Sequence, residues 1–402
     1  MSARGRIGLR VGGFSLAGAL LPIASATAAL GLAQGRAAVS GRSASSTLAG
    51  TWRRLPAAPS PAPTALTVSV WTGRQMVIFG RAYPKPPAGI DVAAAYTVAT
   101  NKWRRLTPLK GPVGNFQGGY HAVWTGKEVL VLGPDDFQAY DPRTGRWRRP
   151  APAPAGVDGA GLVVWTGREM IDWGGGCCGD AFSTGWAFDP AKNAWRKLLA
   201  SPLAPSQVPV GVWTGRELII LVSGIDPVGK SYPASFARAA AYNPRTDTWR
   251  RLAPLPAPRF GARVIWDGRE LLILGGAGAP RAGKPASLAR VGFAYNPAMN
   301  RWRALSPMPA GRENFVSVWT GRRLLIWGGS TTAGASSKAP PSGLAFDASA
   351  DRWSTFPRGP LSGRVSLTAV WTGRSMVLWG GATTLPRYRV FTEGAAFTPA
   401  AR

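Results

Sequence analysis

The sequence predicts an all-β protein, a seven-bladed β-propeller built from four-stranded blades. A Trp-Thr-Gly or Trp-Asp-Gly turn recurs along the chain, and each copy is followed by short apolar segments separated by turn residues. The composition of 51 Gly, 36 Pro and 18 Trp suits short strands and would disrupt helices. The copies recur about every fifty residues, and four-stranded sheets repeated at this spacing pack side by side around an axis. The seven turns begin at Trp71, Trp124, Trp165, Trp213, Trp266, Trp319 and Trp371.

Each repeat predicts four strands. The first strand ends at the repeat Trp, and the glycine of the following turn supplies a positive φ. The second strand is an apolar run, such as residues 271–274, that usually ends in a pair of glycines. The third strand ends on an aromatic residue such as Tyr295, and the fourth begins at a Trp seven residues later, such as Trp302. Because the inner runs show no polar alternation, we expect both of their faces to be buried.

The turn before the fourth strand carries its own signal. Two residues before each fourth-strand Trp stands a Gly, Asn or Asp, residue types that tolerate the left-handed conformation of a short hairpin loop. These residues are Asn101, Gly145, Asn193, Asp247, Asn300 and Asp351.

The ends of the chain predict how the ring closes. After Phe397 the matching Trp would fall beyond the last residue. A fourth-strand sequence, Trp52-Arg53-Arg54-Leu55, stands before the first repeat and matches Trp103-Arg104-Arg105-Leu106. We therefore expect the N-terminal strand to complete the last blade.

The paired glycines, the aromatic residue and the Trp seven residues later resemble kelch repeats over about residues 50–402. The double glycine is lost at Gly80-Arg81, Gly133-Pro134 and Ser223-Gly224, which leaves those strand ends open. The fold is also similar to that of galactose oxidase, whose copper site uses two His and two Tyr. His121 is the only histidine here, so that site cannot be built in the same form.

The N-terminal segment predicts export. Arg4, Arg6 and Arg10 precede a weakly hydrophobic stretch, residues 11–33, with small residues suited to cleavage at Ala24-Ser25-Ala26. We expect residues 1–33 to be a signal peptide or, alternatively, an uncleaved membrane anchor. Residues 34–48 would form a flexible linker and residues 49–402 the propeller, giving a secreted or cell-surface monomer.

The formal net charge of +29 has two interpretations. It could provide solubility and protect outer strands, where arginine pairs such as Arg250-Arg251 are expected. Alternatively, it could attract an anionic partner: an acidic glycan, a wall polymer or an acidic protein segment. The arginines are spread through the repeats and form no single basic run, so nucleic acid is not the expected partner.

A ring of equivalent positions, seven residues before each repeat Trp, predicts a binding site at the loop-rich end of the propeller. Converging guanidinium groups suit carboxylate, sulfate or phosphate, and the kelch resemblance adds that acidic peptides are bound by arginines near this position. Alternatively, these arginines pair with neighbouring carboxylates or carbonyls. The predicted ligand-binding residues are Arg259, Arg312, Arg364, Gln117, Asp158 and Ser206.

Two further hypotheses stay open. A carbohydrate-active enzyme could use Asp172, Asp135, Asp136 or Glu393 as acid and base, and a purely structural interaction module would need no small ligand. The adjacent Cys177 and Cys178 are candidates for a strained disulfide in an exported protein. The sequence predicts no metal site and no cofactor.

Overall fold

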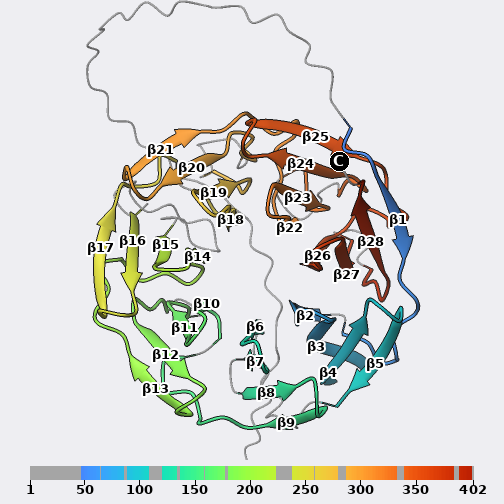
Figure 1. Ribbon diagram of the computed structural model, residues 1–402, viewed down its shortest axis with the longest axis horizontal. Coiled ribbons are helices and arrows are strands. Elements are labelled where there is room, and N and C mark those ends of the chain that lie inside the picture. The colour runs from blue at the N-terminus through green and yellow to red at the C-terminus, as the bar shows by residue number, and fades with distance from the viewer. Residues whose placement is uncertain are drawn as a thin grey trace, which may run out of the picture. The chain divides into compact units, whose positions relative to one another are not determined.

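The computed structural model describes residues 47–63, 65–85, 88–107, 120–133, 136–157, 159–176, 180–222, 238–257, 259–278, 287–332, 339–383 and 389–400. Seven four-stranded antiparallel sheets follow one another around a ring (Figure 1), which confirms the predicted seven-bladed propeller. No helix among these residues is long and apolar enough to cross a membrane.

The blades are numbered in chain order. Blade 1 comprises β2 (Ala65–Trp71), β3 (Gln75–Lys85), β4 (Ala88–Thr97) and β5 (Lys102–Leu106); blade 2 comprises β6 (His121–Trp124), β7 (Val129–Leu132), β8 (Phe137–Asp141) and β9 (Arg146–Arg148). Blade 3 comprises β10 (Leu162–Trp165), β11 (Met170–Trp173), β12 (Gly185–Asp189) and β13 (Ala194–Lys197); blade 4 comprises β14 (Val210–Trp213), β15 (Leu218–Val222), β16 (Arg238–Asn243) and β17 (Thr248–Leu252). Blade 5 comprises β18 (Arg263–Trp266), β19 (Leu271–Leu274), β20 (Phe293–Asn296) and β21 (Arg301–Ala304); blade 6 comprises β22 (Val316–Trp319), β23 (Arg323–Trp327), β24 (Gly343–Asp347) and β25 (Arg352–Phe356). Blade 7 comprises β26 (Val365–Trp371), β27 (Met376–Ala382), β28 (Gly394–Pro399) and β1 (Gly50–Arg54).

The hydrophobic core lies between neighbouring blades. First strands line the inside of the ring and fourth strands its outer edge (Figure 1). Along β19, Leu271 and Ile273 pack toward blade 4, whereas Leu272 and Leu274 pack toward blade 6. The second strands are therefore buried on both faces, as their unbroken apolar sequences predicted.

The N-terminal strand closes the ring as predicted. β1 pairs antiparallel with β28, and Trp52 lies opposite Phe397. The Trp52 indole N–H donates to the Pro357 carbonyl of blade 6 at 2.7 Å. Trp302 makes the equivalent bond to Ala253 of blade 4 at 2.9 Å. The closing Trp therefore fastens blade 7 to its neighbour in the same way as an internal one.

The paired glycines also join blades. Gly275 and Gly276 have φ values of 63° and 78°, and the Gly276 N–H donates to the Arg312 carbonyl of the next blade at 2.8 Å. A Cβ on Gly275 would lie 2.3 Å from that carbonyl oxygen. Where Gly80-Arg81 replaces the pair, β3 and β4 continue as a longer hairpin, held by an Arg81–Asp91 ion pair of 3.3 Å. In blade 1 the second and third strands thus continue past the position of the lost glycine.

The turn before the fourth strand forms as predicted, because all six of its marked residues have a positive φ. Their side chains add a contact that the sequence did not predict. Asn300 Oδ1 accepts a hydrogen bond from the Ala253 N–H of blade 4 at 2.8 Å, and Asp351 accepts one from the Ser306 N–H of blade 5 at 3.0 Å. A residue selected for its backbone conformation therefore also holds the neighbouring blade.

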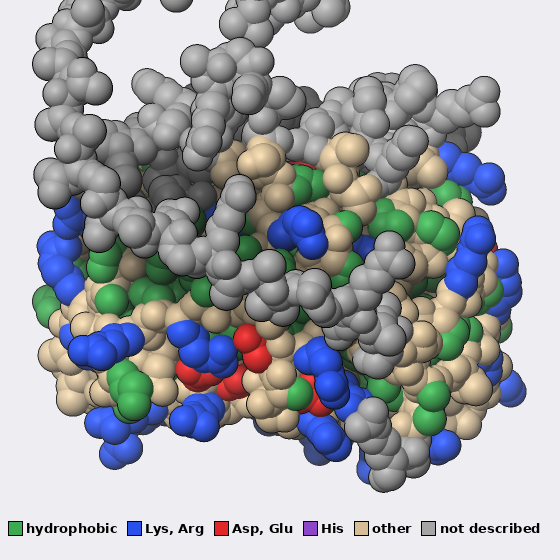
Figure 2. All heavy atoms as spheres, turned by 90° about the horizontal axis from the view of Figure 1, so that it is seen from above, with side chains coloured by type: hydrophobic (Ala, Val, Ile, Leu, Met, Phe, Trp, Pro, Cys, Tyr) green, Lys and Arg blue, Asp and Glu red, His purple; other side chains and the backbone are tan. Residues whose placement is uncertain are grey.

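Arginines that directly follow a fourth-strand Trp form contacts inside the fold. Arg250 binds Glu217 of the same blade at 2.7 Å, and Arg303 binds Glu270 at 2.7 Å. Arg196 binds Glu169 and also donates to the Tyr242 hydroxyl of the next blade at 3.1 Å. Figure 2 views the ring edge-on and shows Asp and Glu side chains set among the Lys and Arg side chains. Part of the positive charge is thus balanced within the blades.

Candidate functional site

The two ends of the ring differ in the connections they carry. We call the end with the second-to-third and fourth-to-first connections the loop face, which includes Gly328-Gly329 and residues 357–364. The Gly329 N–H donates to the Arg364 carbonyl at 3.0 Å, so these two kinds of connection meet there as predicted. The hairpin face is the opposite end, with turns such as residues 320–322 and 348–351.

The predicted ring positions have a main-chain role. The carbonyls of Ser206, Arg312 and Arg364 each accept a hydrogen bond from a glycine N–H of the preceding blade, at 2.8–3.0 Å. Each of these residues therefore fastens two blades together whatever its side chain does. Gln117 and Asp158, and the equivalent Thr64, lie outside the described residues.

The Arg364 side chain is fully engaged by the protein. It is completely buried and stacks over the Phe391 ring at 3.8 Å. Its Nη1 donates to the Gly380 carbonyl at 3.2 Å, its Nε to the Ser362 carbonyl at 3.0 Å and its Nη2 to Glu393 Oε1 at 2.7 Å. Blade 7 thus supplies both the carbonyls and the counter-charge of its arginine.

Arg312 in blade 6 is buried with less compensation. Its Nη1 donates to the carbonyls of Gly328 and Ser342 at 3.1 and 3.0 Å. In the described part of the chain, no carboxylate forms an ion pair with it. Burial lowers the pKa of Arg312 to about 10, so the guanidinium is still charged at neutral pH.

Within the part of the chain that the structure describes, Arg259 in blade 5 has neither a carbonyl acceptor nor a carboxylate partner. It is 5% exposed and lies over the Phe293 ring at 4.7 Å. Its Nη1 is buried without a hydrogen bond, and no ion pair to its guanidinium occurs among the described residues. Burial alone lowers the pKa of Arg259 to about 10, which leaves it a buried cation.

One sequence position contributes to the gradation. The residue before the first glycine of the third-strand segment is Glu393 in blade 7, Ser342 in blade 6 and Val291 in blade 5. The Glu393 carboxylate accepts from Nη2 of Arg364 at 2.7 Å, and the Ser342 hydroxyl accepts from Nη2 of Arg312 at 3.4 Å. Val291 has no side-chain acceptor and is 40% exposed. This position, aligned across the repeats, distinguishes Arg259 from Arg312 and Arg364 in the sequence itself, whereas the arginine positions alone do not.

The described carboxylates of the enzyme hypothesis come from three different blades. Asp136 binds Arg149 at 2.7 Å and accepts a hydrogen bond from Gln138. Asp172 is buried on β11, and Glu393 binds both Arg54 and Arg364. Burial raises the pKa of Glu393, but the two guanidinium groups outweigh burial and hold this pKa below its ordinary value. Asp135, Cys177 and Cys178 lie outside the described residues.

The hairpin face carries a feature that the sequence analysis missed. A basic residue follows the glycine of every repeat turn, and all seven are exposed. The residue before the turn glycine fixes each tip, and it is a threonine in six blades and Asp267 in blade 5. In blade 6, Thr320 Oγ1 accepts hydrogen bonds from the N–H groups of Arg322 and Arg323. The seven tip residues are Arg74, Lys127, Arg168, Arg216, Arg269, Arg322 and Arg374.

These features define the class of the protein: a closed seven-bladed propeller whose glycine pairs, aromatic residues and tryptophans connect the blades. No family model matches the chain. Its curated relatives include Kelch-like protein terF of Aspergillus terreus, 27% identical over 294 residues, or 69% of this chain and 58% of that protein. They also include Kelch-like protein 36 of Mus musculus, 30% identical over 120 residues, or 30% of this chain and 19% of that protein.

Beta-scruin of Limulus polyphemus is a third relative, 25% identical over 96 residues, which cover 24% of this chain and 10% of that protein. These similarities and the seven four-stranded blades together support a kelch-repeat β-propeller family for this chain. The chain spans just over half of the first relative's length and a fifth or less of the other two.

Proposed function

We propose that this kelch-repeat propeller is a binding module that receives a carboxylate of an acidic protein segment at Arg259 on its loop face. The observation that carries the proposal is the buried guanidinium of Arg259, whose Nη1 has no acceptor among the described residues. A buried charge without a partner costs several kcal/mol, and most proteins avoid it by pairing. A carboxylate from a partner would recover this cost on binding, through charge-assisted hydrogen bonds.

The surroundings favour a polypeptide as the source of the carboxylate. Exposed Val291 and the Phe293 ring offer apolar contacts for the aliphatic part of an acidic side chain. Kelch-like relatives support an interaction role for the fold. The net charge of +29 would speed encounter with an acidic partner.

The other predicted contacts have graded roles in this proposal. Arg312 adds a second positive charge without a carboxylate, and Arg364 is neutralised by Glu393 and so contributes least. Gln117, Asp158 and Ser206 stay predicted contacts that would hydrogen-bond the partner's main chain. The direct contact is assigned to Arg259.

The test places a carboxylate beside Arg259 in blade 5, as Glu393 lies beside Arg364 in blade 7. A labelled oligoglutamate peptide is titrated into the whole chain at low salt by fluorescence anisotropy, with oligoglutamine as the neutral comparison. Arg259→Met should weaken oligoglutamate binding about tenfold or more, the effect of losing roughly 1.4 kcal/mol. Val291→Glu should weaken oligoglutamate binding similarly, because the new carboxylate would pair with the Arg259 guanidinium in place of the peptide.

Two controls keep this experiment decisive. Val291→Gln removes the exposed valine without adding charge and should bind within about twofold of the wild type. Arg216→Ala removes one positive charge from the exposed hairpin face and should have the same small effect. Equal losses in Arg216→Ala and Arg259→Met would show general charge attraction and overturn the site.

We propose further that the chain is exported, on the basis of its basic and weakly apolar N-terminal segment. Expression of the full sequence with a C-terminal tag should give a secreted product whose new N-terminus lies near Ala26 or Ala28. A product retained inside the cell with Met1 intact would contradict export.

A further inference from the structure

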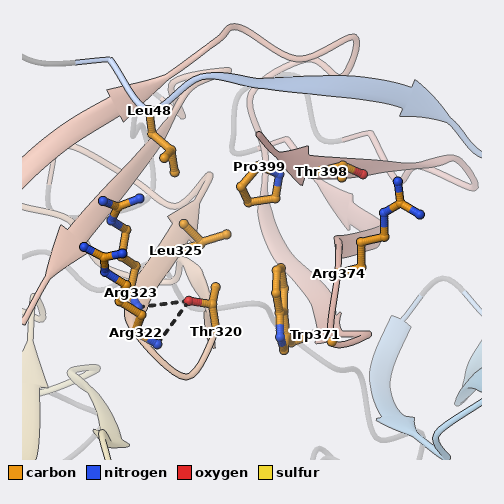
Figure 3. Close-up of a pocket in the computed structure, with 10 residues that line it drawn as sticks. Leu48, Thr320, Arg322, Arg323, Leu325, Trp371, Arg374, Thr398 and Pro399 are labelled. Carbon is orange, nitrogen blue, oxygen red and sulfur yellow. Dashed lines mark hydrogen bonds between the residues drawn. The ribbon is translucent and has the colours of Figure 1, made fainter. Parts of the chain in front are cut away.

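A pocket of about 340 Å³ opens on the hairpin face between blades 6 and 7. Blade 6 contributes Thr320, Arg322 and Leu325, blade 7 contributes Trp371 and Thr398, and Leu48 lies beside them from the N-terminal segment (Figure 3). We call it the seam pocket. It lies at the end of the ring opposite Arg259.

The seam pocket exists because blade 7 is built from both ends of the chain. In the other six blades a turn joins the third strand to the fourth. In blade 7 the third strand ends at Pro399 and the fourth begins at Gly50, and the Ala400 N–H donates to the Ala49 carbonyl at 2.9 Å beside this end of the strand pair. Leu48 continues onto blade 6, where its N–H donates to the Thr355 carbonyl.

The charge around this pocket differs from that at the hairpins of blades 2 to 5. In blades 2 to 5 a glutamate follows the basic tip residue and is ion-paired with a fourth-strand arginine, as Glu217 is with Arg250. That position holds Arg323 in blade 6 and Ser375 in blade 7. Three arginines line the pocket, and the described residues of its wall include no Asp or Glu.

Only one of these arginines is closely compensated. Arg323 binds Asp347 at 3.2 Å, whereas Arg322 lies 4.0 Å from the same carboxylate and its side chain is 62% exposed. In the described part of the chain, Arg374 has no ion pair. Arg322 is thus held at the mouth with most of its charge open to a ligand.

The remaining walls combine an aromatic face with hydroxyl groups. Figure 3 shows the Trp371 indole opposite Thr320 and Leu325, with Arg322 and Arg323 on that side of it and Arg374 on the other. The Thr398 hydroxyl is hydrogen-bonded to the Ser375 hydroxyl at 2.6 Å. An indole face, a cation and hydroxyls meet in one pocket whose volume is at the small end for ligand sites.

We propose that the seam pocket binds an acidic saccharide through a single hexuronate residue. The apolar face of the sugar ring would stack on the Trp371 indole, as amphipathic aromatic side chains allow. Its carboxylate would pair with the Arg322 guanidinium, and its hydroxyls would hydrogen-bond Thr398. Arg374 would add long-range attraction behind the indole. This site is independent of the acidic segment proposed at Arg259.

The test is a titration of the whole chain with trigalacturonate, and neutral maltotriose and inorganic phosphate are the comparison ligands. Calorimetry measures the affinity, and NMR monitors the indole N–H resonances. Trigalacturonate should bind about tenfold tighter than maltotriose, and the indole resonance that disappears in Trp371→Phe should shift during titration. Arg322→Ala should weaken trigalacturonate binding about tenfold, whereas Arg322→Lys should weaken it less.

Matched variants separate this site from general charge and from the loop face. Arg216→Ala removes the equivalent tip of blade 4, where Glu217 follows, and should leave trigalacturonate binding unchanged. Arg259→Met should also leave it unchanged. Equal binding of maltotriose, displacement of the sugar by phosphate alone, or an unshifted Trp371 resonance would each overturn the proposal. If Arg322→Ala fails to fold, the Arg322→Lys variant still tests the proposal.

Discussion

Blades 5 and 7 place an arginine at the same position of the same repeat and treat it in opposite ways. Arg364 is completely buried against Phe391 and meets two carbonyls and Glu393. Arg259 is almost as deeply buried against Phe293, yet its Nη1 has no acceptor among the described residues. Two contacts make the difference: the Gly380 carbonyl accepts from Nη1 of Arg364, and Glu393 accepts from its Nη2, where blade 5 has Val291.

This contrast shows how a repeat protein can hold a structural and a functional copy of one feature. The surrounding fold provides the pocket for the arginine in both blades, so the pocket alone does not reveal a ligand. Where a carboxylate of the same blade pairs with the arginine, the ion pair is part of the fold. Where that carboxylate is missing, a partner's carboxylate can form the ion pair on binding. Arg312, with carbonyls but no carboxylate in the described residues, lies between these extremes.

The largest expected effect tests the closure that holds blade 7 together. Trp52→Ala should lower the free energy of unfolding by about 3–5 kcal/mol, because the indole packs on Trp327, Phe356 and Phe397. Denaturant unfolding measures this loss, and Trp302→Ala in blade 5 is the matched comparison. A loss below about 1 kcal/mol would mean that the N-terminal strand does not support blade 7.

The second effect should have opposite signs in the two blades. Arg364→Met leaves Glu393 and two carbonyls without their donor and should destabilise the fold by about 2–3 kcal/mol. Arg259→Met removes a buried charge without a partner and should stabilise the fold by about 1 kcal/mol. Thermal unfolding of both variants measures the comparison, and destabilisation by both to the same extent would remove the proposed distinction.

The smallest effect depends on pH. The folded-state pKa of Glu393 is held below its unfolded value, so its ion pairs stabilise the protein at neutral pH. That contribution should be lost as the pH falls below roughly 4.3 and through the lower folded pKa. Glu393 is 43% exposed, so screening reduces the effect, and Glu393→Gln should cost about 1 kcal/mol near pH 7.

The control for this measurement is blade 5, where the Val291→Gln variant has no titrating group. Its stability difference from the wild type should not change between pH 7 and acid. A Glu393→Gln difference that persisted undiminished in acid would show that the amide disturbs packing and that the carboxylate charge is not the cause.

The sequence predicted the repeat features well because each depends on local chemistry. A residue such as Asn300 tolerates a positive φ wherever its turn lies, and apolar runs such as residues 271–274 are buried whatever their neighbours. The closing strand was predictable because Trp52 matched a motif that the last blade lacked. The blade-joining bonds of Asn300 and Gly276 were not predictable, since they depend on residues about fifty or thirty-five positions away.

The site depended more on tertiary structure. Sequence alone placed Arg259, Arg312 and Arg364 at one end of the ring, and this ring position lies at the loop face as predicted. Three-dimensional packing decided which guanidinium has an acceptor, because the acceptors come from another connection of the same blade. Packing also decided where the seam pocket opens, since Leu48 and Thr398 belong to opposite ends of the chain. Local sequence thus determined the seven blades and their closure, whereas long-range contacts determined which charges were left for a ligand.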